Sequence, residues 1–246
     1  MNLKALRGLL PVAVVLILWQ LVGDKNSVNA PPPSVWWEAL RQIDESGELW
    51  PAIGKTLRLG AIGLLAALAI GVAVGTAIGA SRRLTAACGP LLEFARATPA
   101  AAIVPAALLL FSADMPTQAG LVTFGTVWPI LLNTAAARAA VPPLRLEVAA
   151  CLRMSRWARL RKVVLPSLLP EIMTGLRVAV PICLIVALLV DFLVATGGIG
   201  YLLVQYQQTF QISAAYALLT VIGVVGILLN VGIGAAERLI LRRWPG

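Results

Sequence analysis

Six long apolar runs constrain the fold of this chain more than any other feature of its sequence. A helix needs about 20 mostly apolar residues to cross the hydrocarbon core of a bilayer. The chain is 59% hydrophobic and only 13% charged, which is too apolar for an ordinary soluble domain. We therefore expect an all-α membrane protein with six transmembrane helices in one domain, residues 1–246. The runs are Leu9–Val22, Leu59–Ala80, Phe94–Phe111, Gly120–Ala137, Ile172–Leu193 and Ala214–Ile233.

The first run also has features of a signal peptide, because it is short and follows Lys4 and Arg7. No small-residue cleavage site follows it, and Asp24-Lys25-Asn26 is a poor context for cleavage. A first transmembrane helix is therefore the better interpretation.

The basic residues are unevenly distributed among the loops. If the runs alternate across a membrane, most of the 20 Lys and Arg residues fall on one side. The positive-inside rule makes that side cytoplasmic, together with both termini. The net charge of +9 is therefore explained by the orientation of the chain in the membrane. Nucleic-acid binding fits the charge poorly, because the basic residues are divided among short loops. The cytoplasmic set is Lys4, Arg7, Arg82, Arg83, Arg138, Arg145, Arg153, Arg156, Arg159, Arg161, Lys162, Arg238, Arg242 and Arg243.

The sequence offers little from which to build a metal site or a catalytic centre. It has no His, and its cysteines have no ligand spacing, so we expect neither a metal nor a disulfide framework. Gly54-Lys55-Thr56 is similar to the end of a Walker A loop, but Leu49 stands where that loop needs Gly. We therefore predict that the chain is not an enzyme. The cysteines are Cys88, Cys151 and Cys183.

Two stretches carry a one-sided helical pattern. In the second run, small residues recur every four positions and form a stripe that suits close approach of another helix, in this chain or in a second subunit. Residues 30–50 form an outer segment in which Pro33-Ser34 starts a helix, and we expect that helix to lie at the membrane surface. The stripe consists of Gly63, Ala67, Gly71, Gly75 and Gly79, and the apolar face of the outer helix of Trp36, Leu40 and Ile43.

A basic segment, Glu147 to Pro166 with the sequence EVAACLRMSRWARLRKVVLP, separates the fourth and fifth runs. Its charges cannot lie in hydrocarbon, so it must be on the soluble side of the membrane. The segment resembles the EAA loop of bacterial ABC importer permeases, a short coupling helix that docks on the ATP-binding subunit. The resemblance covers about residues 30–244. It continues through Thr56-Leu57-Arg58-Leu59, Ala97-Thr98-Pro99 with Pro105, Pro129-Ile130 with Asn133-Thr134, Leu168-Leu169-Pro170 with Gly175-Leu176-Arg177, and Gly198-Ile199-Gly200-Tyr201.

The resemblance implies the type I ABC importer permease fold, in the sulfonate, taurine and nitrate branch, with a cytoplasmic coupling loop at 144–166. It implies a multi-pass protein of the bacterial cytoplasmic (inner) membrane that passes a small solute by alternating access. The implied partners are ABC ATPase subunits that bind ATP and Mg, a second permease copy or close relative, a periplasmic or lipid-anchored binding protein and the bilayer. The chain itself would hold no cofactor and bind no nucleic acid. The resemblance assigns ATPase coupling to Glu147, Ala149, Ala150, Arg153, Ser155, Arg156 and Trp157.

Three positions depart from the family pattern. Arg153 stands where the pattern has a Gly that permits a tight turn, so we expect the coupling helix to run on or to bend differently there. Phe111-Ser112-Ala113-Asp114 lacks the Gly that usually follows the aromatic residue. Asp191 replaces a Glu near the outer end of the fifth run.

Ionisable residues in or near the spans are candidates for substrate contact, because a charge in the bilayer is costly unless it faces a cavity or a partner. Glu93 and Arg96 can pair on one helix face, and we favour a structural role for both. Glu171 and Arg177 lie near the cytoplasmic end of their span, where snorkelling suffices. Since an Asp in the path would repel an anion, we expect Asp191 to gate the path or to pair helices. A polar cluster near the outer mouth fits three roles: lining or gating the outer part of the path, receiving a binding protein, or forming a plain solvated helix. Its members are Gln205, Tyr206, Gln207 and Gln208.

Two other functions stay open at this point. A secondary carrier or channel would work without an ATPase, but it usually needs ionisable groups at the midplane, where these spans are nearly bare. A membrane scaffold would use the basic segment only for docking. The substrate is also open, since in such importers the binding protein selects the solute. Sulfonates, taurine, nitrate and pyrimidine precursors all fit the resemblance.

Overall fold

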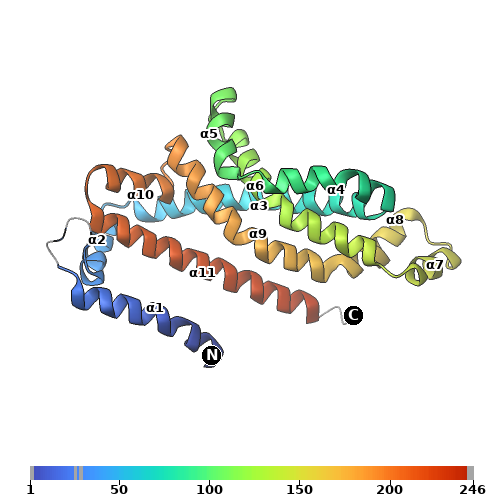
Figure 1. Ribbon diagram of the computed structural model, residues 1–246, viewed down its shortest axis with the longest axis horizontal. Coiled ribbons are helices and arrows are strands. Elements are labelled where there is room, and N and C mark those ends of the chain that lie inside the picture. The colour runs from blue at the N-terminus through green and yellow to red at the C-terminus, as the bar shows by residue number, and fades with distance from the viewer. Residues whose placement is uncertain (1–2, 25–26, 28–29, 243–246) are drawn as a thin grey trace.

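In the computed structural model, which describes residues 3–24, 27 and 30–242, the chain is helical, and those residues form no strand. The prediction of an all-α fold is confirmed. Arg243 of the charge analysis, and Lys25 and Asn26 of the cleavage context, lie outside the described residues. Figure 1 shows α7 and α8 at one end of the long axis and α2 and α10 at the other. The helices are α1 (Leu3–Val22), α2 (Pro33–Glu45), α3 (Leu49–Gly79), α4 (Arg82–Ala97), α5 (Ala100–Leu110), α6 (Met115–Ala140), α7 (Pro143–Cys151), α8 (Arg156–Arg159), a π-helical turn (Leu160–Val164), α9 (Leu165–Val194), α10 (Ile199–Gln208) and α11 (Ile212–Arg242).

Length and composition allow four helical stretches of the described chain to cross a membrane. They are α3, α6, the stretch Arg156–Val194 that contains α9, and α11. The pair α4 and α5 makes a fifth if it is counted as one broken span. In α1 the described apolar part, Leu10–Val22, is shorter.

The third predicted run, Phe94–Phe111, is not one continuous helix. It breaks at Thr98-Pro99, and α4 and α5 meet at 85°. Proline removes a backbone donor and disfavours the helical conformation in the residue before it. Accordingly, Thr98 is extended (φ −71°, ψ 119°), and its hydroxyl donates to the Phe94 carbonyl at 3.0 Å. As a result α5 points away from the other helices (Figure 1).

The stripe of small residues on α3 packs against α6 of the same chain. A Cβ atom on Gly79 would lie 2.3 Å from the Ala135 carbonyl oxygen, and one on Gly75 would lie 2.6 Å from that of Leu131. Ala67, in the middle of the stripe, is fully buried. Backbone contact at this range is the reason that small residues recur every four positions on α3.

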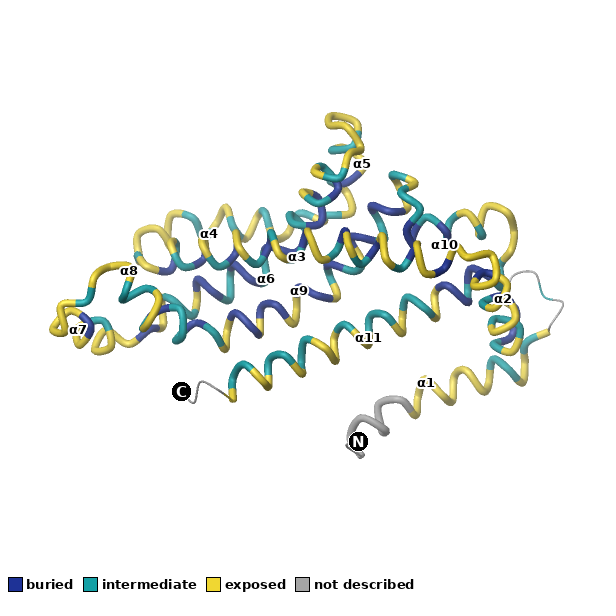
Figure 2. Tube along the Cα trace, turned by 180° about the vertical axis from the view of Figure 1, so that it is seen from behind, coloured by how far each residue is buried: buried dark blue, intermediate teal, exposed yellow. Residues whose placement is uncertain are grey.

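The core lies where α3, α6 and α9 meet, and Figure 2 shows the buried residues following these helices while α1, α4 and α7 are largely exposed. One apolar cluster on α3, α6 and α9 is centred on Ile130, Leu168 and Ala179. A second joins α2, α10 and α11 through Ile43, Ile199 and Leu218. The three long helices therefore form a rigid unit that runs from α7 to α10.

The outer helix α2 is fastened to α1 and α11 by aromatic rings. Trp36 stacks on Tyr216 at 5.2 Å between ring centroids, and Trp19 meets Trp36 edge-on at 5.1 Å. The Trp36 indole N–H donates to the Pro31 carbonyl at 3.0 Å. Ile43 is buried, whereas Trp37 remains exposed. The apolar face expected on this helix is therefore turned toward the other helices.

Candidate functional site

The segment that resembles a coupling helix forms α7, which extends beyond the ends of α6 and α9 (Figure 1). Pro142 and Pro143 start the helix, since Pro fits the first helical turn, where no amide donor is needed. Ala149 is buried toward the body of the protein. The Arg145 guanidinium donates to the Ser167 hydroxyl of α9 at 3.2 Å. This hydrogen bond connects α7 to the start of α9.

The outward face of α7 presents an apolar stripe that sequence reasoning missed. Leu144, Val148 and Leu152 recur at a spacing of four, and their exposed fractions are 68%, 51% and 70%. We call these three residues the α7 stripe. Glu147 is exposed beside the stripe. The spacing itself was the available signal, because an exposed apolar row on a short helix fits a groove on a partner.

Arg153 adopts the left-handed conformation that the family pattern assigns to Gly. Its φ is +52°, its amide donates to the Ala150 carbonyl at 2.9 Å, and the Met154 amide donates to the Ala149 carbonyl at 3.1 Å. These two bonds are the pair of a Schellman motif, which ends a helix by satisfying its last carbonyls. The expectation that α7 would run on or bend differently is therefore wrong, because the capping bonds hold the turn with Arg in place.

Replacing Arg153 by Gly should stabilise the protein. A non-glycine residue in the left-handed region costs about 1–2 kcal/mol, and the greater freedom of Gly in the unfolded chain offsets part of the gain, which leaves roughly 0.5–1 kcal/mol. The measurement is the thermal unfolding midpoint in detergent, with Arg153→Val as the contrasting variant. A midpoint that is higher for Val than for Gly would show that backbone strain at this turn is unimportant.

After the turn, the chain enters the stretch that leads into α9. Ser155 caps α8, its hydroxyl accepting from the Ala158 amide at 3.2 Å. Arg156 and Trp157 are exposed on the same side of the molecule as α7, and Trp157 is 68% exposed. The π-helical turn Leu160–Val164 then continues into α9. Of the residues assigned to ATPase coupling, all except Ala149 are exposed.

Near the other end of α9, Asp191 joins three helices. The Thr56 hydroxyl of α3 donates to one of its carboxylate oxygens at 2.5 Å, and the Thr196 hydroxyl donates to the other at 2.6 Å. Thr56 also accepts from the Ile199 amide of α10 at 2.9 Å. Asp191 is only 1% exposed. We call this arrangement the Asp191 latch; it pairs helices, and sequence reasoning missed Thr56 as its partner.

Glycines give the latch its close approach. A Cβ atom on Gly198 would lie 2.0 Å from an Asp191 carboxylate oxygen, and one on Gly200 would lie 2.2 Å from the Leu188 carbonyl oxygen. Gly197 has φ +75°, a conformation that L side chains rarely adopt. Packing against α9 therefore requires glycine at Gly198 and Gly200, and the left-handed backbone favours it at Gly197.

The polar cluster predicted at the outer mouth lies on α10. Gln205 and Gln208 are exposed, and Tyr206 is half-buried. The Tyr206 hydroxyl donates to a Glu48 carboxylate oxygen at 3.4 Å. Burial, followed by the negative charge of Glu48, raises the pKa of Tyr206. The role of Gln205, Tyr206 and Gln208 in a translocation path or gate stays a prediction.

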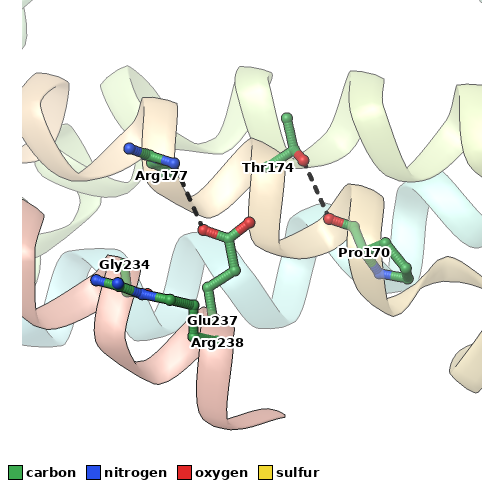
Figure 3. Close-up of polar contacts among 6 residues, drawn as sticks. All are labelled: Pro170, Thr174, Arg177, Gly234, Glu237 and Arg238. Atoms are coloured by element: carbon green, nitrogen blue, oxygen red, sulfur yellow. Dashed lines mark hydrogen bonds and ion pairs between the residues drawn. The ribbon is translucent and has the colours of Figure 1, made fainter. Parts of the chain in front are cut away.

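The other ionisable residues near the spans make local pairs or reach solvent. Glu93 and Arg96 pair on α4 at 2.6 Å, as their spacing predicts. Arg177 of α9 faces Glu237 of α11 across the gap between the two helices, at 3.7 Å (Figure 3). Glu171 is exposed. Glu237 was not anticipated as a partner because 60 positions separate it from Arg177 along the chain.

Comparison with known proteins gives concordant matches. Residues 63–244, from α3 onward, match the family described as binding-protein-dependent transport system inner membrane component. The bicarbonate transport system permease protein CmpB of Synechococcus elongatus is 34% identical over 251 residues, which span 95% of this chain and 90% of the relative. The nitrate import permease protein NrtB of Synechocystis sp. is 27% identical over 247 residues, which span 97% and 90%.

A solved structure shares the fold. It is described as the crystal structure of an amino acid ABC transporter with histidines, and it matches with a TM-score of 0.63 over 83% of this chain and 97% of that chain. At 14% sequence identity, the likeness concerns the fold alone.

Proposed function

Because this chain belongs to the family of binding-protein-dependent transport system inner membrane components, we propose that it uses α7 to couple solute import to an ATPase. The predictions of an ABC importer permease and of a multi-pass inner-membrane protein are confirmed by the family and its relatives. The chain is not an enzyme; ATP hydrolysis belongs to a separate ATPase.

The exposed stripe on α7 is the observation that carries the proposal. Leu144, Val148 and Leu152 expose apolar area on a helix outside the bundle, and exposed apolar rows rimmed by charge are typical of interaction sites. Glu147 and Arg156 supply the charges near the stripe. We assign the stripe to the ATPase contact and these two residues to its rim.

The connection from α7 to the Asp191 latch supports a mechanical role. Arg156–Val194 is helical throughout, 39 residues long, and α9 packs on both α3 and α6. A displacement of α7 by nucleotide-driven closure of the ATPase would therefore be passed on to α9, and the π-helical turn Leu160–Val164 and the internal Pro170 and Pro181 are the points at which this stretch can bend. Alternating access then consists of two arrangements of the helix bundle whose populations the nucleotide state changes.

A second permease copy, or a close relative, is the proposed partner across α4 and α5. None of the residues of α4 is buried, and in α5 only Val104 is. Phe94, Leu109 and Leu110 are exposed there. Figure 1 shows α5 projecting from the body of the protein. This surface suits a partner helix that would complete a central path.

The proposed solute is a small oxyanion delivered by a binding protein. The names of two relatives specify bicarbonate and nitrate, and the resemblance of the sequence adds sulfonates and taurine. These solutes share a compact group of oxygen atoms that carries the negative charge.

Uptake by a reconstituted assembly tests the proposal. Proteoliposomes would contain this chain and the ATPase that co-purifies with it, with ATP inside and the binding protein outside. We expect uptake of at least one labelled solute among bicarbonate, nitrate, taurine and an aliphatic sulfonate, and dependence on both ATP and the binding protein. Uptake without ATP would indicate a secondary carrier or channel. Failure of any ATPase to co-purify would favour a scaffold.

A further inference from the structure

A cavity of about 470 Å³ opens beside the Asp191 latch, between the beginnings of α3 and α6 and the end of α9. Sites for small molecules usually measure about 300–1,000 Å³. We call it the basic cavity because two cations of α3 line it. Its wall consists of Lys55, Arg58, Leu59, Ala113, Met115, Gln118, Asp191, Val194 and Thr196.

The two cations are held side by side without a carboxylate partner. Lys55 and Arg58 are three residues apart on α3, so they share one helix face and repel each other. Among the described residues, neither cation has a carboxylate oxygen within ion-pair distance. Lys55 does interact with Asp191 at longer range, through the Coulomb attraction of their charges. Gly197 crowds Lys55, since a Cβ atom there would lie 2.7 Å from the Lys55 ammonium nitrogen. The Lys55 ammonium nitrogen therefore lies close to the loop between α9 and α10.

Asp191 offsets only part of this positive charge, because one carboxylate faces two cations. Both of its carboxylate oxygens accept hydrogen bonds from threonine hydroxyls, and the side chain is almost fully buried. Arg58, by contrast, is exposed to the cavity. The two cations thus outnumber the one carboxylate, which leaves the cavity with an excess of positive charge.

The rest of the wall favours a small polar guest. The buried Gln118 amide donates to the Ala113 carbonyl at 2.8 Å, which fixes an amide group in the wall. Leu59, Met115 and Val194 make the remainder apolar. Low-polarity walls strengthen the field of nearby charges and raise the local concentration of an oppositely charged solute.

We propose that the basic cavity binds a small oxyanion, with Lys55 and Arg58 as its anion-binding residues. A guanidinium presents paired donors that match the oxygen atoms of a carbonate, nitrate or sulfonate group, and an ammonium adds a compact charge. The solute class rests on the proposed function, whereas the binding itself depends only on the cavity. The Lys of Gly54-Lys55-Thr56 thereby gains a role in binding anions rather than nucleotide.

Anion binding is tested on the purified chain through its thermal unfolding, followed by tryptophan fluorescence. A ligand that binds only the folded protein raises the unfolding midpoint by mass action. At equal ionic strength, nitrate, bicarbonate or methanesulfonate should raise the midpoint relative to chloride. Lys55→Gln and Arg58→Gln should remove that difference. Arg41→Gln, which deletes an exposed cation on α2, should retain the difference between oxyanion and chloride.

Two results would overturn the proposal. One is an equal oxyanion effect in the parent and in the chain that carries both Lys55→Gln and Arg58→Gln. The other is the absence of any oxyanion effect in the parent.

Transport by the reconstituted assembly gives a second, independent result. Loss of a charge-assisted hydrogen bond should lower uptake kcat/KM about tenfold for Arg58→Gln. Lys55→Arg should restore most of the uptake lost in Lys55→Gln. Added salt should weaken uptake by the parent more than by the variants, because screening acts on the cations. If the parent chain binds these anions but the assembly takes up none of them, the proposed solute class is wrong and the binding site still stands. Undiminished uptake by both Gln variants would refute the site and leave the function intact.

Discussion

Replacing Glu147 by Arg is expected to abolish uptake while the protein still inserts into the membrane. Glu147 is exposed beside the α7 stripe and pairs with no cation within the described chain, so its reversal costs the isolated protein little. Reversing a rim charge places like charges against each other across the contact, which costs on the order of 2–4 kcal/mol and weakens association roughly 30- to 1,000-fold. Reversal of Arg156 to Glu should have the same effect. Both predictions are measured as ATP-dependent uptake together with ATP hydrolysis.

The matched control is Glu38→Arg on α2, because it makes the same charge change at the opposite end of the molecule. Uptake by this control should remain close to that of the parent. Val148→Asp provides a second test of the same surface, since it places a charge in the middle of the α7 stripe. Normal uptake by Glu147→Arg and Val148→Asp together would remove α7 from the coupling mechanism.

Replacing Gly198 by Ala is expected to destabilise the protein by about 2–6 kcal/mol, the sum of about 1–3 kcal/mol for overpacking and about 1–3 kcal/mol for displaced hydrogen bonds. The added methyl group would occupy the position of the Asp191 carboxylate. Gly198 has ordinary backbone angles (φ −79°, ψ −177°), so the cost comes from overpacking and displaced hydrogen bonds and not from backbone strain. The measurement is the thermal unfolding midpoint in detergent.

Gly54→Ala is the control for this substitution. Gly54 lies in the same helix as Thr56, but a Cβ atom there would meet nothing within 4 Å. Alanine in a helix interior is favoured over glycine by about 0.5–1 kcal/mol, so this variant should be as stable as the parent or slightly more stable. If both substitutions left the midpoint unchanged, the Asp191 latch would not contribute to stability.

Much of the fold could be predicted from local patterns. The stripe Gly63 to Gly79 indicated a close helix contact because its four-residue spacing depends only on helix geometry. The apolar face of α2 followed from the same argument. Both patterns say which face is covered but not by what, and the choice of α6 as the partner of α3 depends on the tertiary structure.

The candidate site was harder to predict because its contacts join distant parts of the chain. Thr56 and Asp191 are 135 residues apart, and nothing in either local sequence identifies the other. The bend at Thr98-Pro99 had a local cause, but its angle depends on the helices that surround it. At Arg153 the local sequence was misleading. An arginine is unfavourable in a left-handed turn, but the capping hydrogen bonds of α7 stabilise that turn.

The break between α4 and α5 has a consequence for what must surround it in the membrane. At the start of α5 the Ala102 amide donates to the Pro99 carbonyl at 3.0 Å, but Pro99 supplies no side-chain cap for the other first amides. Hydrocarbon cannot solvate free backbone amides, so an irregular segment at membrane depth is tolerated only against protein or water. We therefore predict that the proposed second permease copy, or water in the path between the two copies, covers the break between α4 and α5.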